Sequence, residues 1–221
     1  MHVGAVIVAG GRGTRAGGGM PKQWRWIAGA QVATHSLRAF AAHPSVEQLV
    51  LVVHPDDLES DLWPRQPEAL VVAGGATRGA SVQAGLRHMA AAVDTVLIHD
   101  AARPCVTQRV IDGVLKGLES GPAAAPAVAV VDALWTGKSG RVTGTASRDG
   151  LFRAQTPQGF DLKTVLRAYR QNPEGGADDV EVVRKAGVDV AITPGDDDNL
   201  KITGPDDFAR AESILRARDG H

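Results

Sequence analysis

The sequence is short of cysteine and has no long apolar run, and both absences narrow the class of protein. One cysteine, Cys105, occurs among 221 residues, which excludes a disulfide framework and a metal cluster built on cysteines. We interpret Cys105 as a packed residue, because no neighbouring motif marks a nucleophile. No apolar run reaches about 18 residues, so we expect no membrane-spanning helix. The N-terminal segment lacks a basic stretch followed by an apolar one, so we expect no secretory signal and predict a cytoplasmic protein.

Acidic residues are missing from the start of the chain. The first acid is Glu47, whereas the residues before it include these cations: Arg12, Arg15, Lys22, Arg25 and Arg38. The whole chain has a formal net charge of −1, which argues against a general nucleic-acid-binding protein. A basic segment in a nearly neutral chain indicates an anionic ligand held at one place, with a chance grouping of charges as the alternative.

Hydrophobic residues make up 43% of the chain and alternate between strand-like and helix-like segments. Near-continuous apolar and β-branched runs predict strands buried on both faces of a sheet, at 3–9, 46–53, 69–73, 94–99, 124–131 and 188–193. Apolar spacing and helix-start signals predict helices at 32–42, 79–92, 107–119, 161–171, 178–186 and 205–218. The alternation predicts an α/β fold with a doubly wound, mostly parallel, Rossmann-like sheet.

Residues 132–150 interrupt this alternation. They are polar and punctuated by glycine, with a strand-turn-strand pattern around Gly137 to Gly140. An insertion of this length between α/β elements is usually functional, so we predict a protruding β-arm that serves an interaction. No repeat, linker or low-complexity run divides the chain, and we predict a single domain over residues 1–221.

The glycine-rich loop after the first predicted strand is the first candidate site. Residues 11–16, GRGTRA, fit the G-x-G-x-x-A pattern of dinucleotide-binding loops, but the acid that this pattern needs about 20 residues later is missing. The G-x-x-x-x-G-K-[ST] pattern of the P-loop is also absent. Glycine backbone can place N–H groups around phosphate oxygens, and Arg15 and Lys22 can add positive charge. The loop therefore favours a triphosphate, with a plain flexible loop as the alternative.

The stretch VLIHDAARP, residues 96–104, is the second candidate. Asp100 falls at the carboxyl end of the fourth predicted strand, where ligands of open α/β sheets bind. Its carboxylate could hold Mg2+ or a hydroxyl group, and Arg103 could orient Asp100 or contact a phosphate. A buried Asp100–Arg103 pair with a structural role is the alternative. We interpret His99 as a framework residue rather than a catalytic base.

The stretch GGATRGASVQAGL, residues 74–86, is the third candidate. The backbone at Gly75 and Ala76 could read the edge of a base, and Ser81 could contact base or ribose. Ser81 lies early in the next predicted helix, so its hydroxyl could instead cap that helix.

Together these motifs resemble those of the 2-C-methyl-D-erythritol 4-phosphate cytidylyltransferases, over nearly the whole length. The resemblance rests on motifs in a fixed order: the glycine-rich loop with PKQ, GG-x-x-R-x-x-S-V-x-x-G, HDAARP, L-x-x-A-x-TPQ at 151–158 and DN-x-K-x-T at 198–203. It implies a homodimeric enzyme that transfers CMP from CTP to 2-C-methyl-D-erythritol 4-phosphate in isoprenoid precursor biosynthesis. It also implies Mg2+ as the cofactor, and neither nucleic-acid nor membrane partners.

The resemblance implies a role for each candidate residue. The cytidine part of CTP would contact Ala9, Gly10, Gly11, Gly75, Ala76, Ser81 and Ala101. Arg15 and Lys22 would bind the triphosphate and stabilise the transition state, and Asp100 would lie beside Mg2+ and the substrates. Arg148 and Lys201 would position the methylerythritol phosphate, and the 132–150 arm would place Arg148 in the partner's site.

The acceptor side of the sequence departs from the family pattern. Ala133 stands where a threonine is frequent, Ala76 replaces a common aspartate, and Trp135 occupies a position that is often basic. Three other functions stay open on the residues alone. They are a ribitol-5-phosphate cytidylyltransferase, a sugar-1-phosphate nucleotidyltransferase that uses another nucleotide, and a nucleotide-binding regulator without catalysis.

Overall fold

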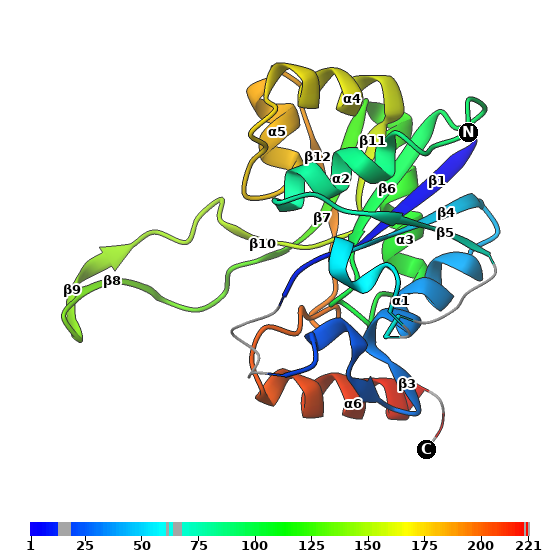
Figure 1. Cartoon of the computed structure of the whole chain (residues 1–221). Coiled ribbons are helices and arrows are strands. Elements are labelled where there is room, and N and C mark those ends of the chain that lie inside the picture. Colours follow the sequence, from blue (N-terminus) through cyan, green and yellow to red (C-terminus); the bar gives the residue numbers. More distant parts are fainter. Residues whose placement is uncertain (13–18, 61, 64–67, 219, 221) are drawn as a thin grey trace.

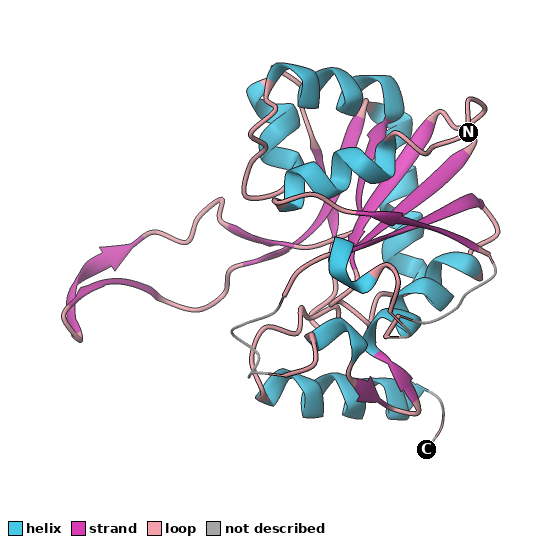
Figure 2. Ribbon diagram, in the orientation of Figure 1, coloured by secondary structure: helices cyan, strands magenta, loops and turns pink. Residues whose placement is uncertain are grey.

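The computed structural model describes residues 1–12, 19–60, 62–63, 68–218 and 220. Its main element is an eight-stranded sheet, drawn in Figures 1 and 2. The strands follow the order β10 (Phe152–Ala154), β7 (Ala123–Ala129), β11 (Gln158–Asp161), β6 (Thr95–Asp100), β1 (Val3–Ala9), β4 (Val46–Val53) and β5 (Ala69–Ala73), with β12 (Ala191–Pro194) paired to β7.

The sheet is mixed and mostly parallel. The central strand β1 is parallel to both β4 and β6, β4 is parallel to β5, and β12 is parallel to β7. The short strands β10 and β11 run antiparallel to their neighbours. The predicted parallel α/β sheet is therefore confirmed, but β10 and β11 were not predicted. They have three and four residues, too few to show a hydrophobic period.

Helices cover both faces of the sheet. One face is covered by α1 (Val32–Ala41) and α3 (Gln108–Gly117), the other by α2 (Arg78–Leu86), α4 (Leu162–Gln171) and α5 (Asp179–Lys185). Successive side chains of β1 point to opposite faces, so Ile7 packs in the first layer with Leu37, and Val6 packs in the second layer with Val82. Burial of each such side chain contributes about 1.5–3 kcal/mol to folding.

Helix α2 ends earlier than predicted. The spacing predicted a helix over 79–92, whereas the helix stops at Leu86. A Cβ atom on Gly85 would lie 2.5 Å from a methyl of Val6, so this glycine lets the last turn approach the sheet closely. Met89, beyond the helix, still packs against the same layer of the core. Because Met89 is partly buried there, the helical spacing of apolar residues in the sequence continues beyond the end of the helix.

The predicted arm forms a separate hairpin that projects from the sheet (Figure 1). Its strands are β8 (Leu134–Lys138) and β9 (Arg141–Ala146). The two residues between them, Ser139 and Gly140, both have positive φ, as a tight hairpin turn of this length requires. Trp135 is 69% exposed on this hairpin, so a large apolar side chain faces solvent in the single chain.

A third apolar cluster lies beside the sheet. Helix α6 (Asp206–Arg218) packs through Phe208 and Ala211 against Ile27 and Ile202, near the short strands β2 (Trp26–Ile27) and β3 (Ala30–Gln31). Three short 3-10 helices complete the description: η2 (Lys22–Trp24), η3 (Pro55–Asp57) and η4 (Leu118–Ser120). Within the described part of the chain, no helix is both long enough and apolar enough to cross a membrane.

Candidate active site

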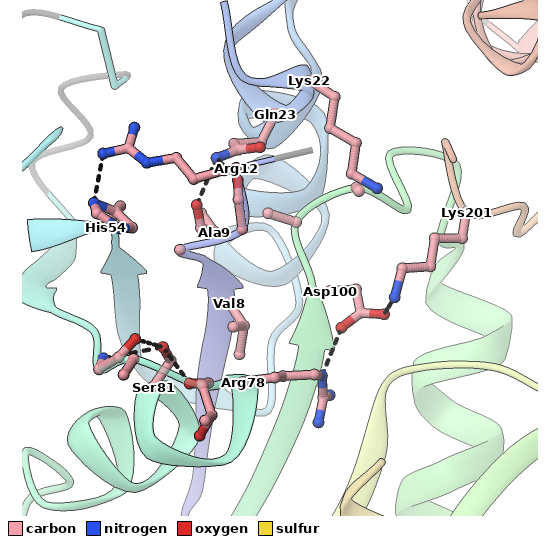
Figure 3. Close-up of a pocket in the computed structure, with 17 residues that line it drawn as sticks. Val8, Ala9, Arg12, Lys22, Gln23, His54, Arg78, Ser81, Asp100 and Lys201 are labelled. Carbon is pink, nitrogen blue, oxygen red and sulfur yellow. Dashed lines mark hydrogen bonds and ion pairs between the residues drawn. The ribbon is translucent and has the colours of Figure 1, made fainter. Parts of the chain in front are cut away.

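A recess of about 330 Å3 opens at the carboxyl ends of four parallel strands. Ala9, His54, Gly75 and Asp100 line it from the ends of β1, β4, β5 and β6. Figure 3 shows these loops converging on one space. The candidate residues that line the recess are Ala9, Gly10, Gly11, Lys22, Gly75, Ala76, Ser81, Asp100, Ala101 and Lys201. The fold thus brings most of the predicted site together.

The start of the glycine-rich loop is held by Gln23 of the PKQ motif. The Gln23 side chain is 3% exposed, and its Nε2 donates to the carbonyls of Ala9 and Gly11 at 2.7 and 2.9 Å. A buried amide thereby fixes the backbone where β1 gives way to the loop (Figure 3). Residues 13–18 lie outside the described residues, so the prediction for Arg15 stays a prediction.

Arg12 lines the recess, but its guanidinium forms ion pairs with two acidic residues of the protein. Its guanidinium donates to Asp57 at 2.8 Å and to Asp56 at 2.6 Å, both on η3. Asp57 is buried and also accepts from the indole N–H of Trp24 at 3.0 Å. Arg12 therefore ties the glycine-rich loop to η3. The excess of basic residues near the N-terminus indicates an anionic ligand for this segment, but Arg12 pairs with acidic residues of the protein instead.

The Gly75 segment is shaped by two hydroxyl groups. Thr77 caps α2 by accepting from the Ala80 N–H at 3.0 Å, so capping by Ser81 is wrong. The Ser81 hydroxyl accepts from the Gly75 N–H at 3.1 Å and donates to the Thr77 carbonyl at 3.0 Å. A Cβ on Gly74 would lie 2.6 Å from the Ser81 oxygen. Gly74 thus allows the close approach of this loop to Ser81.

Asp100 is the only carboxylate that lines the described recess, and it is surrounded by cations. Its Oδ2 accepts from Lys201 Nζ at 2.7 Å, its Oδ1 accepts from Arg78 Nε at 3.3 Å, and Arg103 Nε lies 4.0 Å away. Burial by itself opposes ionisation of Asp100. The charges of Arg78, Lys201 and Arg103 outweigh burial and hold the pKa of Asp100 well below its ordinary value. The carboxylate is therefore ionised at neutral pH.

Arg103 binds the protein backbone more closely than it binds Asp100. Its terminal nitrogens donate to the carbonyls of Asn199 at 2.8 Å and Ala154 at 3.2 Å. The guanidinium thus joins the loop after β6 to β10 and to the segment before Lys201. The predicted Asp100–Arg103 contact exists, but the nearer partners of Asp100 are Lys201 and Arg78.

His99 is a framework residue, as predicted. Its side chain is fully buried, and burial lowers its pKa to about 4, so the ring is neutral at pH 7. One ring nitrogen lies 3.1 Å from the Arg103 carbonyl and the other 2.9 Å from the Thr156 hydroxyl, which also accepts from the Asp100 N–H at 3.2 Å. Because a carbonyl can only accept, the ring proton is assigned to Nε2, which faces the Arg103 carbonyl, and Nδ1 accepts from the Thr156 hydroxyl. The network holds the backbone of Asp100 in place.

A second, smaller recess of about 180 Å3 adjoins the first. The residues common to both are Arg78, Asp100 and Lys201. Arg103 lines the second recess only, beside Thr156. The ion pairs of Asp100 therefore form the wall between two adjacent spaces. Arg78 was not predicted, although it is the arginine of the GG-x-x-R motif.

Comparison with known proteins shows the family to which this chain belongs. Residues 3–217 match the family model described as 2-C-methyl-D-erythritol 4-phosphate cytidylyltransferase (IspD). The chain belongs to this family. It is 66% identical to a 2-C-methyl-D-erythritol 4-phosphate cytidylyltransferase of Roseobacter denitrificans, over the full length of both chains. It is 56% identical to a bifunctional IspD/IspF enzyme of Paracoccus denitrificans, of which the match spans 55%.

Solved structures agree with this cytidylyltransferase assignment. A crystal structure of 4-diphosphocytidyl-2C-methyl-D-erythritol synthase has a TM-score of 0.84 and 31% identity, covering 96% of this chain and 98% of that one. A cytidylyltransferase structure from Thermus thermophilus has a TM-score of 0.81 and 28% identity, with the same coverage. The predicted family and the nucleotidyltransferase fold are therefore confirmed.

Arg148 lies apart from the recess in this cytidylyltransferase chain. It is exposed at the base of the arm, where its guanidinium donates to the Val131 carbonyl of the opposite leg. It therefore closes the stem of the arm, and neither recess includes it. The role of Arg148 in the active site of a second copy of the chain therefore stays a prediction.

Proposed function

We propose that the larger recess binds CTP and that the chain transfers its cytidylyl group to 2-C-methyl-D-erythritol 4-phosphate. The products are 4-diphosphocytidyl-2-C-methyl-D-erythritol and pyrophosphate. The observation that carries this proposal is one ionised carboxylate surrounded by Lys201, Arg78 and Arg103, at strand ends that also present glycine backbone. Family membership supplies the reaction, and this arrangement supports its place in the fold.

The nucleotide is assigned to the glycine-lined part of the recess. The cytidine moiety would contact the loop after β1, the Gly75 segment and the start of the loop after β6, through Ala9, Gly10, Gly11, Gly75, Ala76, Ser81 and Ala101. Lys22, on η2, lines the same recess and would bind the triphosphate together with Arg15. Backbone N–H groups and cations are the partners that phosphate oxygens prefer.

The acceptor is assigned to the smaller recess. Lys201 faces both spaces, so it can hold the acceptor phosphate against the α-phosphate of CTP. Arg103, which lines the same recess, would also contact the acceptor. Arg148 would reach the site from the arm of a second chain. The exposed Trp135 on each hairpin supplies apolar surface for such a homodimer.

The reaction needs positioning and charge stabilisation rather than a base. An oxygen of the acceptor phosphate attacks the α-phosphorus of CTP, the new P–O bond forms, and the bond to the β-phosphate breaks with release of pyrophosphate. The attacking phosphate is already ionised at neutral pH. Lys22, Arg15 and Lys201 would stabilise the charge that develops on the phosphate oxygens while the two substrates are held in line.

The donor set fits a magnesium ion held mainly by its substrates. Among the described residues, no group of three or more His, Cys, Asp or Glu side chains could hold a metal. Mg2+ is commonly bound by one or two carboxylates together with substrate phosphates. Asp100, ionised and on the wall of the recess, would be its protein ligand. The ion would neutralise triphosphate charge in the transition state.

A panel of substrates tests the proposal. Pyrophosphate release is measured with CTP, UTP, ATP or GTP against 2-C-methyl-D-erythritol 4-phosphate or ribitol 5-phosphate. We expect turnover with CTP and the methylerythritol phosphate, and thermal stabilisation by CTP but not by GTP. A ligand at a hundredfold excess over its Kd adds about 2.7 kcal/mol to the free energy of unfolding. Turnover confined to ribitol 5-phosphate, or equal stabilisation by CTP and GTP, would overturn the assignment.

A matched pair of variants places the reaction in this recess. Lys201→Ala should lower turnover by about a hundredfold, because the removed cation is aimed at developing phosphate charge. Lys163→Ala removes an exposed lysine of α4 and should leave turnover unchanged. Equal activities of the two variants would place the reaction elsewhere.

A further inference from the structure

Asp179 is a fully buried carboxylate whose two oxygens both have partners. Its Oδ1 accepts from the hydroxyl of Tyr169 at 2.5 Å, and its Oδ2 accepts from Nη2 of Arg78 at 2.8 Å. A buried carboxylate is costly unless it is paired and hydrogen-bonded. Its pairing therefore favours one orientation of the Arg78 side chain.

The backbone around Asp179 is held by the glutamine of the TPQ motif. Gln158 is buried on β11, and its Oε1 accepts from the N–H groups of Asp179 and Val180 at 3.1 and 3.0 Å. Its Nε2 donates to Asp178, the residue that caps α5, at 2.8 Å. Gln158 thus fixes the position of Asp179, the first residue of α5, relative to strand β11 of the sheet.

Arg78 connects Asp179 to Asp100, which lies in the wall between the two recesses. Its Nη2 is bound to Asp179, and its Nε donates to the oxygen of Asp100 that Lys201 does not occupy. Figure 3 shows Arg78 and Lys201 approaching Asp100 from opposite sides. Burial by itself lowers the pKa of Arg78, but the charges of Asp179 and Asp100 together raise it above its ordinary value, so the guanidinium stays charged.

We propose that Asp179 is a positioning residue for the transfer reaction, which with Tyr169 fixes Arg78 against Asp100. The inference deepens the proposed function and rests on it. Without Asp179, the Arg78 guanidinium is free to turn toward solvent or toward ligand phosphates. Asp100 then loses the partner that fixes one of its oxygens. A displacement of about 1 Å in a reacting group is enough to cost on the order of a hundredfold in rate.

The first test separates turnover from binding and from stability. Asp179→Asn keeps the shape of the side chain and removes its charge, and Tyr169→Phe removes one hydroxyl. We expect Asp179→Asn to lower kcat by about tenfold or more with the KM for CTP changed by less than about threefold, and Tyr169→Phe to lower kcat by a smaller factor in the same direction. Asp161→Ala, which removes the cap of α4, is the control, because it should lower the melting temperature and leave kcat unchanged.

The second test asks whether Asp179 acts through Arg78. Arg78→Gln is made alone and together with Asp179→Asn. If Asp179 acts through Arg78, the double variant loses no more activity than Arg78→Gln alone. Losses that multiply, or an Asp179→Asn enzyme with unchanged kcat, overturn the inference. If Asp179→Asn does not fold, the same comparison is made with Tyr169→Phe in the wild-type and Arg78→Gln backgrounds.

The wild-type enzyme is assayed first with CTP and 2-C-methyl-D-erythritol 4-phosphate. An inactive wild type would overturn the proposed function and this inference together. An active wild type with independent losses in the double variant would overturn this inference alone.

Discussion

Three cations meet one carboxylate, Asp100, and two of them come from distant parts of the chain. Lys201 and Arg78 bind its two oxygens, and Arg103 lies 4.0 Å away. With Asp179, which pairs with Arg78, two negative charges face these three positive ones, so this corner of the recess keeps a net positive charge. Such a corner attracts a triphosphate and a phosphate monoester. The same arrangement keeps Asp100 ionised, as its proposed role as a ligand of Mg2+ requires.

Asp100→Asn tests the role of this charge. We expect turnover to fall by about a hundredfold or more, because the amide cannot balance the surrounding cations or bind Mg2+ as a carboxylate does. The free energy of unfolding should fall by only about 1–2 kcal/mol, since Arg78 keeps Asp179 as a partner and Lys201 can reach solvent. Pyrophosphate release and urea unfolding measure the two effects.

Asp112→Asn is the matched control, because Asp112 is an exposed carboxylate that pairs with His43 away from the recess. It should leave turnover unchanged. An Asp100→Asn protein that unfolds, while its folded fraction keeps normal activity, would show that Asp100 is structural.

Cys105 should be protected from alkylation in the folded protein. Burial raises the pKa of its thiol to about 11, although the charge of Arg218 opposes the shift, so little thiolate exists at pH 8. Because the folded pKa lies above the ordinary value, this thiol contributes stability below about pH 9, and the contribution is lost as pH rises through about 11. Intact mass after iodoacetamide treatment at pH 8 measures the reaction, with the urea-unfolded protein as the reference. Equal labelling of folded and unfolded chains would contradict the burial argument.

Short elements rather than long ones shape the larger recess, the proposed CTP site. The 3-10 helix η2 carries Lys22 into the recess and Gln23 beneath the glycine-rich loop. The 3-10 helix η3 holds the same loop from the other side through Asp56 and Asp57, which bind Arg12. The first turn of α2 supplies Thr77 and Ser81, which bend the Gly75 segment. These contacts preorganise backbone groups before the ligand arrives.

Gln23→Ala tests this preorganisation. Loss of the amide leaves the Ala9 and Gly11 carbonyls without their donor, which costs about 1–3 kcal/mol of stability for a buried acceptor. We expect the KM for CTP to rise by about tenfold and kcat to change less. Gln31→Ala removes a similar bond, to the Leu62 carbonyl, and should leave the KM for CTP unchanged. An equal rise in KM for both variants would show that general loosening of the chain is responsible.

The protruding arm is a feature of the whole molecule. It has its own two-stranded sheet, apart from the eight-stranded one, and it exposes Trp135 and Val142. An isolated two-stranded hairpin is marginally stable by itself, so contact with another surface would stabilise it. The proposed homodimer supplies that surface. The single-domain assignment over 1–221 stays a prediction.

A mixed dimer tests whether the arm completes the partner's site. Lys22→Ala and Arg148→Ala should each be nearly inactive as homodimers, since each lacks a cation in both sites. In a dimer with one chain of each kind, both lesions fall in one site if Arg148 crosses, and the other site is intact. Each lost cation costs on the order of 3 kcal/mol, or about a hundredfold in rate, so the restored site should stand far above either parent.

The two variants are co-expressed with different tags, and the doubly tagged dimer is purified before pyrophosphate release is measured. Lys163→Ala paired with Arg148→Ala in the same way gives the activity of a dimer in which Lys22 is intact. A folded mixed dimer as inactive as its parents would show that Arg148 acts within its own chain, and an active Arg148→Ala homodimer would show that Arg148 has no part in the reaction.

Local patterns in the sequence determined the main strands, the helices and the arm, and motifs that resemble those of a known family implied most of the candidate site residues. The spacing of hydrophobic residues and the glycine-rich motifs each involve residues a few positions apart, so they can be recognised in the sequence without knowledge of the fold. The tertiary structure alone decided that Arg78 binds Asp100 and Asp179, which lie 22 and 101 positions away. It also decided that Arg12 binds acids of the protein, and that β10 and β11 enter the sheet antiparallel. Such pairings follow from the packing of distant segments, and the charge or apolar character of a residue does not specify which distant partner it will meet.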